Sequence, residues 1–156
     1  LRVKKLYIAV IVLLFSINIA YYLHYYYFNT PLSYAKEWHF GMKEVIAEVE
    51  KRQENFTQVW FSRNAWGYIY PLFYLKYPPD KYQTQARLTG LNQFGFGWVN
   101  AFDKYIFADV GYISQIYPNI LYVGTPDDFA KIKKPIHTVF YPDGKTAFYL
   151  ADINSF

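Results

Sequence analysis

Cysteine is absent from this 156-residue chain, and the other residues that bind soft metals are scarce, with three His and one Met. The missing thiols exclude disulfides, thiolate-bound zinc and cysteine nucleophiles. His24, His39 and His137 stand too far apart in the sequence to form a His-x-x-x-His metal motif. We therefore expect no metal site and no bound cofactor.

Long runs of like charge are also missing. Sixteen Lys and Arg oppose twelve Asp and Glu, which gives a net charge of +4. Arg2, Lys4 and Lys5 account for three of the positive charges, and residues 131–134 have the composition of a solvated loop. No basic surface of the kind that binds nucleic acid is indicated, and we expect no nucleic-acid partner.

Motifs that carry chemistry are lacking as well. Gly95-Phe96-Gly97 has no third glycine of a dinucleotide loop and is better explained as strand glycines beneath aromatic side chains. Asp127 and Asp128 are accounted for by their place in the first turn of a predicted helix. Neither a Ser-His-Asp set, nor a P-loop, nor a nucleophile elbow occurs. We expect no catalytic residue in this chain.

One long apolar run dominates what is present. Residues 6–28 read LYIAVIVLLFSINIAYYLHYYYF without a charge, and a helix of that length measures roughly 34 Å, against about 30 Å for the hydrocarbon core of a bilayer. The six aromatic side chains at its end suit the headgroup region. The run predicts a transmembrane helix within residues 1–28.

The flanking charges predict the orientation of this helix. Arg2, Lys4 and Lys5 favour a cytoplasmic N-terminus, so that residues 29–156 form an extracytoplasmic domain on the cell membrane. A secretory signal peptide is the alternative, but its apolar region is usually about 7–15 residues long and ends at small residues. Because the chain begins with Leu1 and not Met, we also expect missing upstream sequence.

The domain after residue 28 has the pattern of an α/β fold. Residues 29–32 read as a linker, Ser33 as an N-cap, and residues 34–53 as a helix with one apolar stripe for the core. The members of that stripe are Trp38, Met42, Val45, Ile46 and Val49.

Strands and helices alternate through the rest of the domain. Residues 58–62 and 120–124 predict strands, 66–76 an apolar helix stopped by the prolines at 78–79, and 125–128 the start of another helix. Residues 94–99 and 104–108 read as extended pieces with a break at 100–103, and Asp143-Gly144 predicts a hairpin between 136–141 and 146–153. The sequence predicts a small Rossmann-like layered domain with a mixed sheet and a C-terminal β-hairpin.

Three segments carry a resemblance to a known family. Residues 31–44 (PLSYAKEWHFGMKE), 68–83 (YIYPLFYLKYPPDKYQ) and 142–148 (PDGKTAF) resemble the C-terminal region of bacterial polytopic glycosyltransferases that use lipid-phosphate sugar donors. Protein O-mannosyltransferases and aminoarabinose transferases belong to the same superfamily. His39 and Met42 depart from the family pattern, because aromatic or polar residues are frequent at these positions.

The resemblance implies a function that is shared with missing sequence. The chain is expected to be the last membrane helix and the extracytoplasmic domain of an enzyme that transfers a sugar from a polyprenyl-phosphate donor. The catalytic acidic residue of that family lies in an early extracytoplasmic loop, so none is carried over here. Its partners are then membrane lipid, upstream membrane helices of the same protein, and a lipid-linked sugar or glycan acceptor.

Two alternatives stay open at this point. Aromatic residues make up 23% of the chain, and Trp66, Tyr68 and Tyr70 beside Gly67 are candidates for stacking on a sugar. The preferred interpretation of residues 66–74 is packing mainly inside the domain, with Phe73 in the core, and partly against the membrane body. A single-span, membrane-anchored binding or sensor domain is the alternative function.

Overall fold

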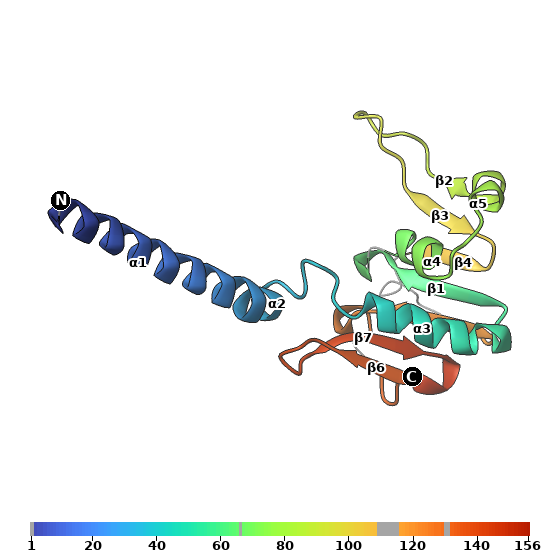
Figure 1. Ribbon diagram of the computed structural model, residues 1–156. Coiled ribbons are helices and arrows are strands. Elements are labelled where there is room, and N and C mark those ends of the chain that lie inside the picture. The colour runs from blue at the N-terminus through green and yellow to red at the C-terminus, as the bar shows by residue number, and fades with distance from the viewer. Residues whose placement is uncertain (1, 66, 109–115, 130–131) are drawn as a thin grey trace. The chain divides into compact units, whose positions relative to one another are not determined.

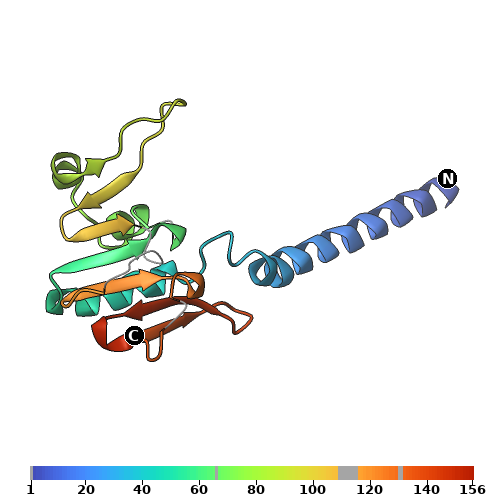
Figure 2. The same ribbon diagram turned by 180° about the vertical axis from the view of Figure 1, so that it is seen from behind.

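The computed structural model describes residues 2–65, 67–108, 116–129 and 132–156 (Figure 1). Contacts divide the chain into two compact units, Leu1–Trp38 and His39–Phe156. The first unit is helical and the second is an α/β domain, which Figure 2 shows from behind. Each unit is described by itself below.

The first unit consists of one continuous helical run. Helix α1 (Arg2–His24) passes through a π-helical turn (Tyr25–Asn29) into α2 (Thr30–Ser33). Residues Val3–Ser33 form one helix that is long and apolar enough to cross a membrane. The predicted linker at 29–32 is therefore wrong. Pro31 lies inside this run just after the π-helical turn, and because it has no backbone N–H it donates no hydrogen bond to the preceding turn.

Helix α3 (Met42–Arg52) begins nine residues later than the predicted N-cap at Ser33. His39 and Gly41 adopt the left-handed conformation, with φ of 50° and 95°, and this backbone cannot continue a right-handed helix. Trp38, which was expected in the apolar stripe, is consequently 79% exposed. The rest of that stripe is confirmed, because Met42, Val45, Ile46 and Val49 are fully buried.

The second unit is built on a mixed seven-stranded sheet in the order β2-β3-β4-β1-β5-β7-β6. The central strand β1 pairs in parallel with β4 and β5, and the outer pairs are antiparallel. The predicted α/β class, mixed sheet and C-terminal hairpin are confirmed. The strands are β1 (Gln58–Ser62), β2 (Arg87–Leu88), β3 (Val99–Phe102), β4 (Tyr105–Ala108), β5 (Ile120–Gly124), β6 (His137–Phe140) and β7 (Thr146–Ala151).

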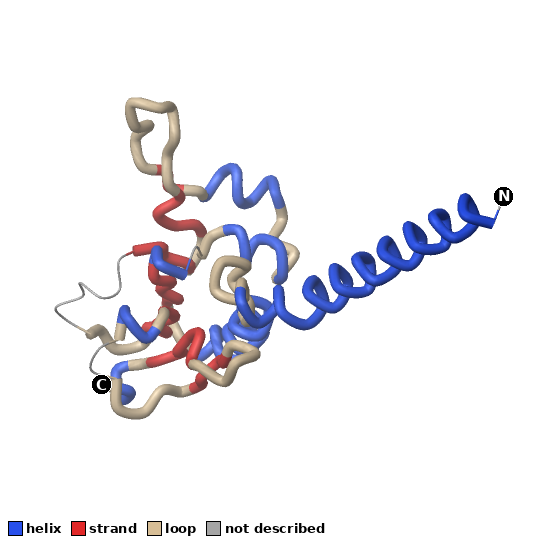
Figure 3. The backbone as a smooth tube through the Cα atoms, turned by 90° about the vertical axis from the view of Figure 1, so that its left-hand side faces the viewer, coloured by secondary structure: helices blue, strands red, loops and turns tan. Residues whose placement is uncertain are grey.

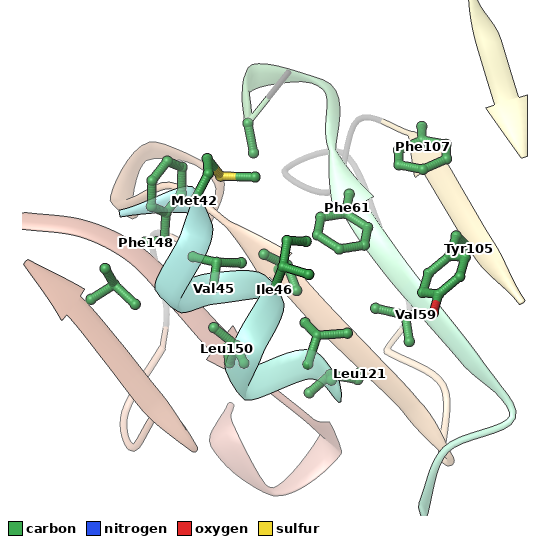
Figure 4. Packing of buried hydrophobic residues seen from close by; sticks show 14 of the residues in the cluster. Met42, Val45, Ile46, Val59, Phe61, Tyr105, Phe107, Leu121, Phe148 and Leu150 are labelled. Atoms are coloured by element: carbon green, nitrogen blue, oxygen red, sulfur yellow. The ribbon is translucent and has the colours of Figure 1, made fainter. Parts of the chain in front are cut away.

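The main core lies between α3 and one face of the sheet. Figure 4 shows Met42, Val45 and Ile46 directed from α3 toward side chains of the strands. Those side chains come from β1, β4, β5 and β7 and include Val59, Phe61, Tyr105, Phe107, Leu121, Phe148 and Leu150. Apolar burial of this extent is the dominant stabilising term for a domain of this size.

A smaller core covers the opposite face. Ile120 and Tyr122 alternate with the main-core residues of β5, and they pack with Phe129, Ala151 and the partly buried Phe156. All five residues of β5 are buried as a result. This two-sided burial explains why the strand is a continuous apolar run in the sequence.

Two short helices follow β1. Helix α4 (Ile69–Tyr74) is shorter than the predicted 66–76, and α5 (Pro79–Gln85) occupies a segment that was expected to stop a helix. Pro79 stands at the first position of α5, where its fixed φ favours helix initiation. Phe73 is 72% exposed, so its predicted place in the core is wrong.

The segment between α5 and β4 also differs from prediction. Residues 94–98 form a loop and not a strand, while β3 (Val99–Phe102) runs through the predicted break. The actual turn falls at Asp103, which has a φ of 47°. Figure 3 shows the loop between β2 and β3 extending away from the strands. After β5, the predicted helix is only a single 3₁₀ turn (Pro126–Asp128).

Candidate functional site

The sequence singled out three aromatic residues around the start of α4 as sugar contacts. Trp66 lies outside the described residues. Tyr68 is 38% exposed and meets the ring of Phe107 edge-on at 6.4 Å between centroids. Tyr70 is half-buried and stacks on Tyr74 at 6.4 Å. Each described ring therefore presents part of its surface to solvent, and sugar stacking by Tyr68 and Tyr70 stays a prediction.

Tyr70 also has a polar partner that sequence reasoning missed. Its hydroxyl lies 2.6 Å from Nδ1 of His39, and the two rings meet edge-on. The left-handed backbone at His39 directs its imidazole toward Tyr70, whereas a continuous helix through residues 34–53 would direct it differently. No local sequence signal connects two residues that are 31 positions apart.

Burial determines the protonation of this pair. It lowers the pKa of His39 and raises the pKa of Tyr70, with the nearby Tyr74 adding to the second effect. Both groups are therefore neutral at pH 7. A neutral imidazole and phenol can exchange hydrogen bonds with each other and with an uncharged ligand such as a sugar hydroxyl.

A second polar cluster lies at the carboxyl ends of β1 and β5. Asp128 is 8% exposed, and its carboxylate accepts hydrogen bonds from the backbone N–H and hydroxyl of Thr125 at 2.7 Å and from Asn64 at 2.8 Å. Parallel sheets commonly bind ligands at this edge. Here, however, the carboxylate closes a capping box and ties β1 to β5, which supports the structural interpretation of Asp128.

The space beside this cluster is small. A side chain added at Gly124 would come within 2.9 Å of the Phe129 ring and 3.0 Å of the Asp128 carboxylate. The neighbouring Asp127 is exposed. The two carboxylates thus have different surroundings, and their place in one capped 3₁₀ turn accounts for both.

A shallow polar hollow of about 460 Å³ lies beside the end of α5. Its lining comes from Thr84, Gln85, Ala86, Arg87 and Asp103. One guanidinium and one carboxylate face this hollow, which suits a small polar ligand but defines no reaction.

The most exposed apolar surface of the domain is the loop at residues 88–98. Leu91, Phe94, Phe96 and Trp98 are 74%, 72%, 70% and 55% exposed. Gly95 was expected in a strand, but its φ of 79° places it in a turn. The available sequence signal was the absence of charge from residue 88 to residue 102 together with three aromatics separated by single glycines.

The described residues contain no cluster of metal ligands. Within residues 2–65, 67–108, 116–129 and 132–156, no group of three or more His, Asp or Glu side chains is arranged to hold an ion. The candidate surfaces are therefore a neutral Tyr–His pair, a polar hollow and an aromatic loop.

These observations define a class of protein, namely an α/β domain joined to an apolar helix long enough to cross a membrane. No protein-family model matches the chain, and no curated protein or solved structure matches it significantly.

Proposed function

We propose that this chain is the last membrane helix and the extracytoplasmic domain of a membrane glycosyltransferase that takes its sugar from a polyprenyl-phosphate donor. The chain is non-catalytic by itself in this proposal. The catalytic residues belong to an upstream membrane body, and the domain supports that body or contacts the lipid-linked sugar or the glycan acceptor.

One observation carries the proposal: the three segments that resemble this family meet in the folded domain. His39 of segment 31–44 bonds Tyr70 of segment 68–83. A methyl group at Gly41 would lie 3.7 Å from the ring of Phe148, which belongs to segment 142–148. Contact between the segments that carry the resemblance supports treating them as one unit of the proposed domain.

The apolar helix supports the membrane location. Its described side chains are exposed along the 31 residues Val3–Ser33, and Ser16 returns its hydroxyl to the carbonyl of Val12 at 2.8 Å. The interior of such a helix pairs its backbone groups within the helix, as a membrane span requires. The basic residues Lys4 and Lys5 favour a cytoplasmic N-terminus, which places the domain outside.

Recovery of the complete gene provides the first test. Further apolar spans upstream support the glycosyltransferase, whereas a start codon immediately before Leu1 supports a single-span binding or sensor module. Membranes that contain the complete product should transfer sugar from a radiolabelled polyprenyl-phosphate donor. The 156-residue chain alone should not, and transfer by chain freed of the complete enzyme would refute the non-catalytic role.

Orientation is tested separately. A reporter that is active only in the cytoplasm, fused after Phe156, should be inactive. Activity at that end contradicts the extracytoplasmic location. The mass of the membrane-extracted protein distinguishes the span from a signal peptide, because cleavage after the apolar run would remove it.

Sugar contact by the aromatic candidates has its own matched control. Tyr68→Ala should weaken glycan binding to the full chain about three- to tenfold, as expected for the loss of one aromatic stacking contact. Phe73→Ala removes an equally aromatic but more exposed ring from α4 and should leave binding unchanged. Calorimetry that shows equal affinities for wild type and Tyr68→Ala excludes this ring as a contact.

A further inference from the structure

The loop between β2 and β3 combines exposed apolar side chains with a backbone that pairs part of its polar groups within the loop. Phe94 and Phe96 donate their backbone N–H groups to the side-chain oxygen of Asn92, at 2.9 and 3.0 Å. The N–H of Asn92 bonds the Phe96 carbonyl at 2.9 Å, and that of Gly95 bonds the Asn92 carbonyl at 2.9 Å. The tip is thus held in one conformation by a single amide side chain.

The base of the loop is closed in the same way. The N–H of Thr89 donates to the Trp98 carbonyl at 2.8 Å, and the N–H of Trp98 donates to the Thr89 hydroxyl at 2.7 Å. Unpaired N–H groups are what normally keep an irregular loop out of an apolar medium. Six N–H groups of residues 89–98 are paired within the loop, and this lowers the penalty when the loop leaves water.

Its side chains have the chemistry of the bilayer interface. Trp and Phe partition to the region between headgroups and acyl chains, and a charged residue would oppose entry. Every residue from 88 to 102 is uncharged, while Arg87 at the base can face lipid phosphates. The loop extends away from the sheet in both views of the ribbon (Figures 1 and 2).

We infer that residues 91–98 insert into the lipid–water interface and form a second membrane attachment of the domain. A bilayer is the occupant that the chain itself supplies, since Val3–Ser33 tethers the domain to one and raises its effective concentration there. The inference shares with the proposed function only the membrane span, and sugar transfer plays no part in it.

Single-cysteine labelling tests the inference directly, because the chain has no cysteine of its own. Phe96→Cys is labelled with a nitrobenzoxadiazole dye in the full chain and reconstituted into vesicles of phosphatidylcholine and phosphatidylglycerol that contain lipid spin-labelled near the headgroup. Phe140→Cys is the matched control, since Phe140 is 53% exposed and lies on β6 at the opposite edge of the sheet. Phe15→Cys lies near the middle of the apolar run, so its quenching in a second set of vesicles, with lipid spin-labelled deep in the acyl chain, reports whether the helix is in the bilayer.

The expected result is lipid quenching at Phe96→Cys at least about twofold stronger than at Phe140→Cys, as interfacial insertion requires. Adding Phe94→Asp should reduce it to the Phe140→Cys level, whereas Ile153→Asp, a charge at another exposed apolar position, should not. Equal quenching at Phe96→Cys and Phe140→Cys overturns the inference. A second outcome also overturns it: the dye at Phe96→Cys is quenched neither by lipid nor by aqueous iodide, and this protection is lost when the protein is diluted with more lipid. The loop is then covered by a second copy of the chain and not by the bilayer.

Phe15→Cys separates this inference from the proposed function. Quenching at Phe15→Cys without quenching at Phe96→Cys leaves the membrane span standing and rejects the loop. Quenching at neither position rejects both. Quenching at Phe96→Cys alone supports the loop and rejects the span.

Discussion

Two hairpins close the two edges of the same sheet, and they use apolar residues in opposite ways. In the hairpin of β6 and β7, Val139, Phe148 and Leu150 are at most 2% exposed, and the turn is polar, with Lys145 bonded to Asp143 at 2.9 Å. In the hairpin of β2 and β3, the aromatic residues stand in the turn itself and are more than half exposed. Both hairpins send strand residues into the core, but the turn of one is polar and the turn of the other presents apolar surface outward.

The difference is determined by what covers each hairpin. Helix α3 lies over the β6–β7 side of the sheet, where a methyl group at Gly41 would touch Val139. The short helix α5 contacts β3 but leaves residues 88–98 uncovered. An apolar sequence segment therefore shows that a surface favours leaving water, but only the tertiary structure shows whether the core of the domain covers that surface.

The largest expected effect is in the packed hairpin. Phe148→Ala should lower the free energy of unfolding by about 3–5 kcal/mol, because it empties a fully buried site. Phe96→Ala, the same change in the exposed hairpin, should alter it by less than about 0.5 kcal/mol. Urea denaturation of the full chain in mild detergent measures both. Similar losses for the two variants would remove the distinction between the hairpins.

Two glycine substitutions test how much the close packing of Gly41 against Val139 contributes to stability. Gly41→Ala should destabilise by about 2–4 kcal/mol, because a Cβ at a φ of 95° is strained and would lie 2.7 Å from Val139. Gly144→Ala has a φ of 82° with nothing within 4 Å, so only the backbone strain of about 1–2 kcal/mol remains. The same denaturation assay applies, and equal effects would show that the Val139 contact adds nothing.

Helix α3 carries a buried acidic residue, Glu48, whose ionisation makes the stability of the domain depend on pH. Lys51 at 2.6 Å and Arg52 bond the Glu48 carboxylate and lower its pKa from 4.5 to about 2. A lowered folded-state pKa gives stability that is present above pH 4.5 and lost as pH falls through about 2. Glu48→Gln should therefore cost about 1 kcal/mol at pH 7, and this difference should vanish toward pH 2.

Hydrogen exchange locates the effect of Glu48→Gln. Amides of β6 and β7, which pack on α3, should exchange faster in the variant at pH 7, and those of Phe94 and Phe96 should not. Uniform acceleration across both hairpins would mean that the domain opens only as a whole. A Glu50→Gln variant is the control, since Glu50 is exposed on the same helix, and it should leave the exchange of β6 and β7 unchanged.

The smallest expected effect is at α4. Phe73→Ala should change stability by less than about 0.5 kcal/mol, because 72% of this side chain is already exposed. A loss of 3 kcal/mol or more, of the size that follows core truncation, would restore the packing role expected from sequence. Leu72→Ala, at a partly buried position on the same helix, is the positive control.

Sequence reasoning located the elements whose signal is local. Strands β1 and β5 were predicted at their observed bounds, because two-sided burial selects a short continuous run of β-branched and aromatic residues. The hairpin followed from Asp143-Gly144, in which Gly144 indeed has a positive φ. These are preferences of a few neighbouring residues, and they hold whatever the rest of the chain does.

The failures share a non-local cause. Residues 34–53 were predicted as one helix, but Gly41, which lies close to Val139, has a left-handed backbone, and the helix begins only at Met42. Phe73 was placed in the core because α4 is apolar all round, but α4 buries Pro71, packs Leu72 on the core and leaves Phe73 exposed. Of the candidate site, the sequence identified Tyr70 and could not reveal His39 beside it, because their contact depends on how α4 packs against α3.

The two edge strands of the sheet are short and irregular, which affects how readily neighbouring copies can pair with them. Strand β2 has only two residues, β6 has four, and a register shift interrupts the pairing of each with its neighbour. Short, irregular outer strands present few aligned backbone groups to another chain. Proteins held on a surface meet one another far more often than in free solution, and a long flat strand at either border would then template fibrous aggregation. By this reasoning, the domain can be displayed at high density and remain dispersed.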